Sequence, residues 1–234
     1  FLFVNAGLTG FFNANLHDII YKVIQTPLVG LGSSIWATLV AIFFVQFLWF
    51  FGLHGQILVN SVMDPIWNTL MLDNLEAYQA GKHLPHIISK SFMETFTVGL
   101  GGSGMTLAVV IIMAFILKKK MYKDVGRLAL GAGIFNINEP VIFGLPIVLN
   151  ATILIPWVLA PIVVTAFNYI VMAVGIVPAP TGVAVPWTVP VFFSGMLATN
   201  SILGGVLQLV DMVIVGFIWY PFLRMLDKQP DSVL

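Results

Sequence analysis

Residues 131–150, GAGIFNINEPVIFGLPIVLN, place one ionisable side chain, Glu139, inside an apolar run. Asn136 and Asn138 lie beside it, and glycines and prolines interrupt the run on both sides. A carboxylate at membrane depth is costly, and irregular backbone is tolerated there only where protein buries it or a watery cavity receives it. The stretch therefore predicts a ligand site at a helix break, an arrangement typical of membrane transporters.

The composition of the whole chain agrees with a membrane location. Hydrophobic residues make up 59% of the chain and charged residues 9%, and the mean hydropathy is +1.00. The apolar runs are long and unbroken, which favours spanning helices over short alternating strands. We therefore expect an all-α integral membrane protein that combines transmembrane helices, re-entrant hairpins and interfacial amphipathic helices.

Charge and cysteine content exclude several other functions. Ten basic residues balance ten acidic residues, so nothing indicates a nucleic-acid partner. The chain has no cysteine and so can form neither a disulfide nor a cysteine nucleophile. The glycine-rich run at residues 99–104 lacks the lysine of a phosphate-binding loop, and His83 and His86 have no third metal ligand nearby. We expect no cofactor and no metal.

The pattern along the chain predicts an amphipathic, interfacial segment at residues 1–33 and a transport domain at residues 34–234. Apolar runs predict helices at residues 35–51, 105–117, 153–177 and 201–222. Polar, glycine-broken sequence predicts re-entrant segments near 52–66 and 128–150. The charged stretch at residues 67–92 is too polar to span a membrane and predicts an interfacial segment.

A cluster of basic residues predicts the orientation of these segments. Half of all basic residues lie within ten positions: Lys118, Lys119, Lys120, Lys123 and Arg127. The positive-inside rule places this loop in the cytoplasm, together with the basic tail after the last span. Both ends are cytoplasmic if residues 128–150 enter the membrane and return, because two crossings then separate them. Complete passage of that segment would put the tail outside.

Several motifs in order resemble the membrane-embedded IIC component of bacterial sugar phosphotransferase systems, in the lactose, cellobiose and diacetylchitobiose branch. They are WFFGLHG at 49–55, LPHI at 84–87, LGGSGMTL at 100–107, NINEPVIFGLPIV at 136–148 and VPWTVPVFFSGMLAT at 185–199. The resemblance implies a multi-pass permease in the bacterial inner (cell) membrane, in contact with lipid. It also implies a β-linked disaccharide substrate, a homodimer and a further N-terminal half, absent here. Phosphate would come from a cytoplasmic IIB phosphocarrier, itself supplied by IIA, since this chain has no donor cysteine.

A sugar site needs polar groups for hydroxyls and flat aromatic faces for the apolar faces of the rings. The candidate substrate-binding residues share these properties: Trp49, His54, Asn138, Glu139 and Trp187. By resemblance, Glu139 holds the hydroxyl that is phosphorylated, with His54 beside it, and it is the candidate catalytic residue. Its role as general base or as hydrogen-bond partner stays open. Asp211, deep in the last span, is left outside the site.

The residues alone leave other functions open. An ion-coupled secondary transporter of a small polar solute could use Glu139, with or without Asp211, as a proton or cation relay. A structural membrane subunit could use the polar break for helix packing. Only the resemblance separates the phosphotransferase permease from the secondary transporter, and it does not decide among cellobiose, diacetylchitobiose and lactose.

Overall fold

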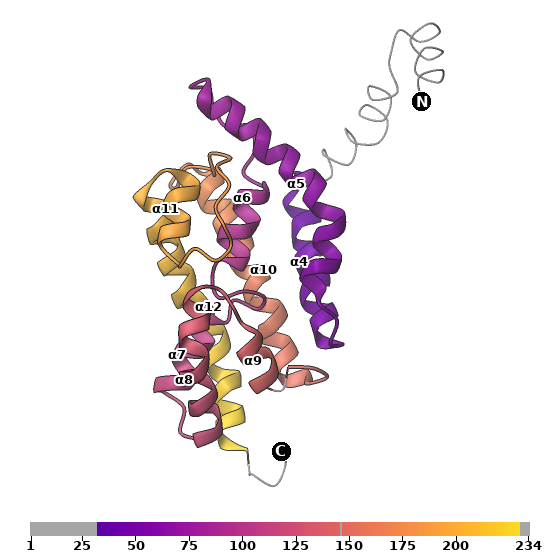
Figure 1. The fold of residues 1–234 in the computed structure, drawn as a ribbon, viewed down its shortest axis with the longest axis vertical. Coiled ribbons are helices and arrows are strands. Elements are labelled where there is room, and N and C mark those ends of the chain that lie inside the picture. Colours follow the sequence, from indigo (N-terminus) through magenta and orange to yellow (C-terminus); the bar gives the residue numbers. More distant parts are fainter. Residues whose placement is uncertain (1–31, 146, 230–234) are drawn as a thin grey trace, which may run out of the picture.

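A computed structural model describes residues 32–145 and 147–229, and within these residues every regular element is a helix (Figure 1). The all-α class expected from the sequence agrees with this architecture. The interfacial segment expected at residues 1–33 lies outside the described residues, apart from residues 32 and 33.

The described helices follow one another in a simple order. They are α4 (Ile35–Phe50), α5 (Gly55–Gln79), α6 (Lys90–Met93), the π-helix η2 (Glu94–Val98), α7 (Leu107–Phe115), α8 (Lys120–Ile134), α9 (Glu139–Gly144), α10 (Ala151–Ala173), α11 (Phe193–Thr199) and α12 (Ile202–Lys228). Ser34, Asn150 and Ser201 cap α4, α10 and α12, since each side chain accepts a hydrogen bond from a backbone N–H of the following turn. Such caps satisfy donors that have no partner inside the helix.

Two of the helices within residues 32–145 and 147–229 are long and apolar enough to cross a membrane. These are α10, with 23 residues, and α12, with 27 residues, while α4 is a shorter apolar helix. The helices α10 and α12 run antiparallel and pack together (Figure 1). Trp157 and Trp219 meet edge to face between them, with ring centroids 6.3 Å apart. Trp157 Nε1 also donates to the backbone oxygen of Gln46 at 3.2 Å, which joins α4 to the pair.

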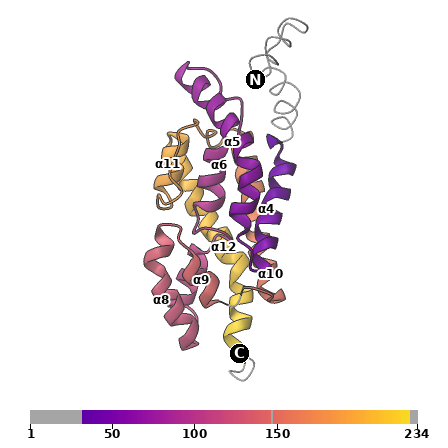
Figure 2. The same ribbon diagram turned by 45° about the vertical axis from the view of Figure 1, so that its right-hand side comes forward.

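The shorter helices form two groups at opposite ends of these long helices. At one end α7 and α8 pack as an antiparallel pair, α9 packs on α8, and α12 ends nearby (Figures 1 and 2). At the other end lie α6 and α11 (Figure 2). The irregular segments 99–106 and 135–138 meet between the two groups, where the backbone N–H of Gly101 donates to Asn136 Oδ1 at 2.7 Å.

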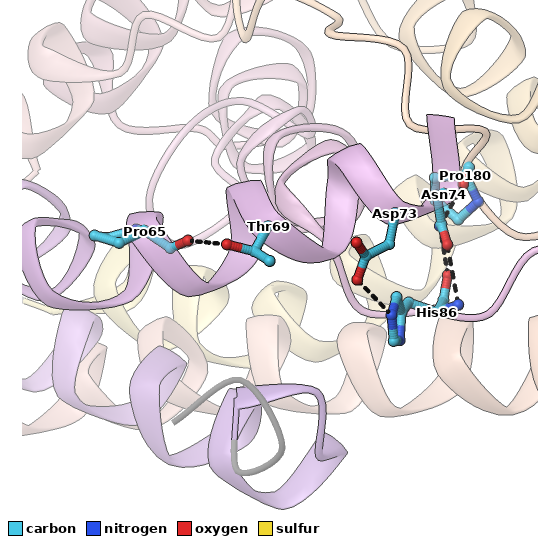
Figure 3. Close-up of polar contacts among 6 residues, drawn as sticks. All are labelled: Pro65, Thr69, Asp73, Asn74, His86 and Pro180. Atoms are coloured by element: carbon cyan, nitrogen blue, oxygen red, sulfur yellow. Dashed lines mark hydrogen bonds and ion pairs between the residues drawn. The ribbon is translucent and has the colours of Figure 1, made fainter. Parts of the chain in front are cut away.

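The helix α5 occupies most of the polar stretch for which the sequence predicts a re-entrant segment near 52–66 and an interfacial segment at 67–92. A short turn at residues 51–54 is followed by one helix that continues through Pro65 to Gln79. The oxygen of Pro65 accepts a hydrogen bond from Thr69 Oγ1 at 2.9 Å (Figure 3). Asn60, Ser61 and Asp64 line a cavity. Their polarity therefore marks one face of a helix and not a loop.

The segment after α5 folds back onto that helix through buried polar contacts. Asn74, which has no exposed surface, donates from Nδ2 to the backbone oxygens of His86 at 2.6 Å and Pro180 at 2.8 Å (Figure 3). Its Oδ1 accepts from the backbone N–H of His86 at 3.0 Å. Asp73 Oδ2 lies 3.2 Å from His86 Nε2. These contacts fix the approach of the chain to α6.

One carboxyl group is wholly buried between α10 and α12. Asp211 has no exposed surface, and its Oδ2 accepts a hydrogen bond from Asn168 Nδ2 at 2.9 Å. Asp211 Oδ1 and Asn168 Oδ1 have no hydrogen-bond partner among the described residues. Asp211 does not line the cavity that contains Glu139.

We expect Asp211→Asn to raise the free energy of unfolding by about 1 kcal/mol, because an amide avoids the cost of burying an ionised carboxylate and adds a donor at the contact with Asn168. Asp211→Ala should instead lower it by about 0.6–1.7 kcal/mol, since the bond between the helices is lost. Thermal unfolding of the detergent-solubilised full-length protein measures both. Equal losses in the two variants would contradict the argument.

Candidate functional site

A cavity of about 560 Å³ lies where the helix breaks meet. This volume falls within the range of about 300–1,000 Å³ that is usual for small-molecule sites. The residues that line it come from α4, α5, α6, η2, α9 and the connecting segments: Trp49, His54, Gln56, Ile57, Asn60, Ser61, Asp64, Lys90, Glu94, Val98, Gly102, Ser103, Asn136, Asn138, Glu139 and Trp187. All five candidate residues named from the sequence are among them.

Trp49 and His54 form one wall, at the turn between α4 and α5. Their ring centroids are 4.5 Å apart. Trp49 Nε1 donates to Ser103 Oγ at 3.1 Å, and Ser103 Oγ donates to Gln56 Oε1 at 2.6 Å. His54 Nδ1 accepts from the backbone N–H of Ile57 at 3.3 Å. In the neutral ring the proton is therefore assigned to Nε2, which can donate to a ligand.

Asn138 and Glu139 line the cavity at the start of α9. Asn138 is 7% exposed, and its Nδ2 donates to the backbone oxygen of Ser103 at 2.7 Å. This bond orients the amide and leaves Oδ1 as an acceptor. Glu139, the first residue of α9, is exposed within the cavity. The pair therefore offers acceptor oxygens to a ligand.

Asn136 holds three segments of the site together. Its Oδ1 accepts from the backbone N–H of Gly101, and its Nδ2 donates to the backbone oxygens of Trp187 at 2.6 Å and Val189 at 3.1 Å. Its φ of 64° lies in the left-handed region, which asparagine adopts more easily than most residues. Asn136 thereby fixes the backbone that presents Trp187, whose surface is 45% exposed.

Three charged residues of the cavity were missed in the sequence analysis. Lys90 Nζ lies 2.7 Å from Asp64 Oδ1 and 2.7 Å from Glu94 Oε1. The spacing of Lys90 and Glu94 by four residues was an available signal, because such residues share one helix face. The contact with Asp64 had no such signal, since it joins α5 to α6. With Glu139, the cavity has more carboxylates than cationic groups.

The part of the chain that the structure describes is all-helical, with two membrane-length helices and a polar cavity at helix breaks, which are features of a membrane transport protein. The family description "Phosphotransferase system, EIIC" matches residues 1–161. This chain belongs to that family, which confirms the resemblance noted from its motifs.

Individual relatives agree with this assignment. The chain is 62% identical over 228 residues to the PTS system oligo-beta-mannoside-specific EIIC component of Bacillus subtilis (strain 168), covering 97% of this chain and 52% of that protein. It is 44% identical over 218 residues to the PTS system cellobiose-specific EIIC component of Geobacillus stearothermophilus, covering 92% of this chain and 48% of that protein. The chain thus spans about half the length of these relatives.

A solved structure has the same fold. It is the crystal structure of the transporter ChbC, the IIC component from the N,N'-diacetylchitobiose-specific phosphotransferase system. The match has a TM-score of 0.94 and 41% sequence identity, and it covers 97% of this chain and 52% of that chain. The all-helical fold is therefore that of a known membrane transporter.

Proposed function

We propose that this chain forms the substrate-binding part of a sugar permease of a phosphotransferase system. The permease binds a β-linked disaccharide or a short oligosaccharide, carries it across the bacterial cell membrane and presents it for phosphorylation. The observation that carries the proposal is the cavity of about 560 Å³, in which acceptor oxygens, a histidine and two tryptophans from separate segments converge. The names of the relatives, specific for oligo-β-mannoside, cellobiose and diacetylchitobiose, support the substrate class.

The site residues have distinct roles in this proposal. Glu139 and Asn138 Oδ1 accept hydrogen bonds from sugar hydroxyls, and His54 Nε2 donates to one. Trp49 and Trp187 cover the apolar faces of the rings. Glu139 holds the hydroxyl that receives the phosphoryl group. Since positioning dominates phosphoryl transfer, a carboxylate that orients this hydroxyl contributes whether or not it also removes the proton.

The charge of the cavity supports an uncharged ligand that later leaves as an anion. The cavity is lined by three carboxylates, from Asp64, Glu94 and Glu139. Lys90 is the one lysine or arginine in its lining. A neutral sugar adds no net charge to this site and is not repelled by the carboxylates. A phosphorylated sugar is repelled, because two further negative charges would enter a site that is already acidic. Phosphorylation would therefore favour release of the product.

The phosphoryl donor belongs to a partner. This chain has no cysteine, and the family resemblance implies a cytoplasmic IIB phosphocarrier that is supplied by IIA. The basic loop that begins α8 supports a cytoplasmic location for that end of the molecule. The backbone N–H groups of Lys118 and Lys119 donate to Asp227 at 2.9 Å and 2.8 Å, which joins this loop to the end of α12. Both basic ends therefore lie on one side.

With the cytoplasmic end so assigned, α8 and α9 form a re-entrant hairpin. The chain enters the membrane along α8, turns at residues 135–138 and returns along α9. Glu139, the first residue of α9, then lies at membrane depth next to this turn. The family further implies a homodimer in contact with lipid, and we include both in the proposal.

Vesicles that contain the full-length protein test this proposal. We expect sugar phosphate to form from external cellobiose or mannobiose only when phosphorylated IIB is present inside. An uncoupler should leave this reaction unchanged, and omission of IIB should abolish it. Uptake of unmodified sugar without IIB, and its loss on addition of the uncoupler, would instead identify an ion-coupled secondary transporter.

A further inference from the structure

A second cavity, of about 330 Å³, adjoins the candidate site. Lys90, Glu94 and Trp187 line both cavities, so the two share a wall. The remaining lining residues come from α5, from the residue after Lys90 and from the loop before α11: Asn68, Met71, Ser91, Ala184, Val185 and Pro186. Glu139, His54 and Asn138 line only the first cavity.

The lining of the second cavity has the chemistry of a sugar subsite. Pro186 and Trp187 offer flat apolar surfaces, and Met71 can adapt to the shape of a ring face. Asn68 supplies an amide that can both donate and accept. Ser91 Oγ donates to the backbone oxygen of Val183 at 2.7 Å, which joins the loop before α11 to α6.

The two volumes can be compared per sugar ring. If the first cavity of about 560 Å³ holds both rings of a disaccharide, the second, of about 330 Å³, has room at the same volume per ring for one further ring. Resting on the proposed function above, we propose that the second cavity is the subsite for the third ring of a β-linked trisaccharide.

The residues that line both cavities, compared with those that line only the first, indicate which end of the sugar chain lies at Glu139. The hydroxyl to be phosphorylated lies at Glu139, in the part of the first cavity that the second does not share. The third ring then lies beyond Lys90 and Glu94, on the side away from the reacting end. An extended β-linked chain can thus lengthen without displacing the hydroxyl that reacts.

The test compares a trisaccharide with a disaccharide in the full-length protein. Calorimetry with cellobiose and cellotriose, and with mannobiose and mannotriose, gives the affinities. In the series that binds, we expect the trisaccharide to bind at least tenfold more tightly than the disaccharide, about 1.4 kcal/mol. Met71→Trp fills the second cavity and should remove this advantage, while disaccharide affinity stays within twofold.

Two further variants serve as a control and as an independent test of the second cavity. Leu72→Trp adds the same bulk at the next residue of α5, which is 53% exposed and lines neither cavity, and it should change neither affinity. Ala184→Phe fills the second cavity from the loop before α11, whereas Met71 lies on α5. It should remove the trisaccharide advantage even if Met71→Trp does not fold.

The outcomes separate this inference from the function on which it rests. Saturable disaccharide binding without an advantage for the trisaccharide would overturn the subsite and leave the permease intact. An advantage that survives both filling variants, or equal losses for both sugars, would also overturn the subsite. Failure of every sugar to bind the wild-type protein would overturn the proposed function itself.

Discussion

Replacing Glu139 by glutamine is expected to weaken binding of the disaccharide substrate at least tenfold, about 1.4 kcal/mol. Hydrogen bonds to a charged acceptor contribute about 1.5–3 kcal/mol, and the amide keeps the shape of the side chain while it removes the charge. Glu139 is the first residue of α9 and is exposed in the cavity, so glutamine does not disturb a packed core. Calorimetry on the full-length protein measures the change.

Glu76→Gln is the matched control, because Glu76 is an exposed residue of α5 that does not line the cavity. It should leave sugar affinity unchanged. Equal affinity in wild type and Glu139→Gln would remove Glu139 from sugar recognition. The rate of phosphorylation at saturating sugar then separates its two possible roles. A general base predicts a further loss of about 10²–10⁴-fold, whereas a hydrogen-bond partner alone predicts little further loss.

Gly102→Ala is expected to disrupt the site by displacing Asn136 and Asn138. Gly102 has a φ of +77°, and a Cβ atom there would lie 2.7 Å from Asn138 Cγ and 2.8 Å from the backbone oxygen of Asn136. Left-handed backbone costs alanine about 1–2 kcal/mol, and forced displacement of packed neighbours typically costs about 1–3 kcal/mol more. We expect the free energy of unfolding to fall by about 2–5 kcal/mol and disaccharide affinity to fall more than tenfold.

Gly175→Ala is the control that distinguishes the cost of left-handed backbone from the steric clash expected in Gly102→Ala. Gly175 has a φ of +80°, and nothing lies within 4 Å of a Cβ atom built there. This variant therefore has a similar backbone cost and no steric clash. It should lower the free energy of unfolding by about 1–2 kcal/mol and leave disaccharide affinity unchanged. Thermal unfolding and calorimetry test the pair, and similar losses of affinity in both variants would contradict the argument.

Some predictions from the sequence agree with the structure because they rest on local pattern. The apolar runs at residues 153–177 and 201–222 predicted helices. The structure has α10 at Ala151–Ala173 and α12 at Ile202–Lys228, so each helix overlaps most of its predicted range. At α5 the structure places Asn60, Ser61 and Asp64 inside a helix, after the turn at residues 51–54, and the re-entrant segment near 52–66 stays a prediction. These three residues line a cavity on one face of a continuous helix. A window of sequence cannot distinguish a polar loop from a helix whose polar face meets a site.

The sequence by itself determined the membrane class, the family and the prediction of a ligand site at Glu139, because composition, apolar run length and motifs are properties of neighbouring residues. Only the tertiary structure decided which distant side chains surround that carboxylate. Lys90 meets Asp64 across 26 positions of the chain, and Asn136 holds the backbone of Trp187 across 51 positions. Such contacts depend on how helices pack and where their breaks meet, and helical periodicity carries no information on either.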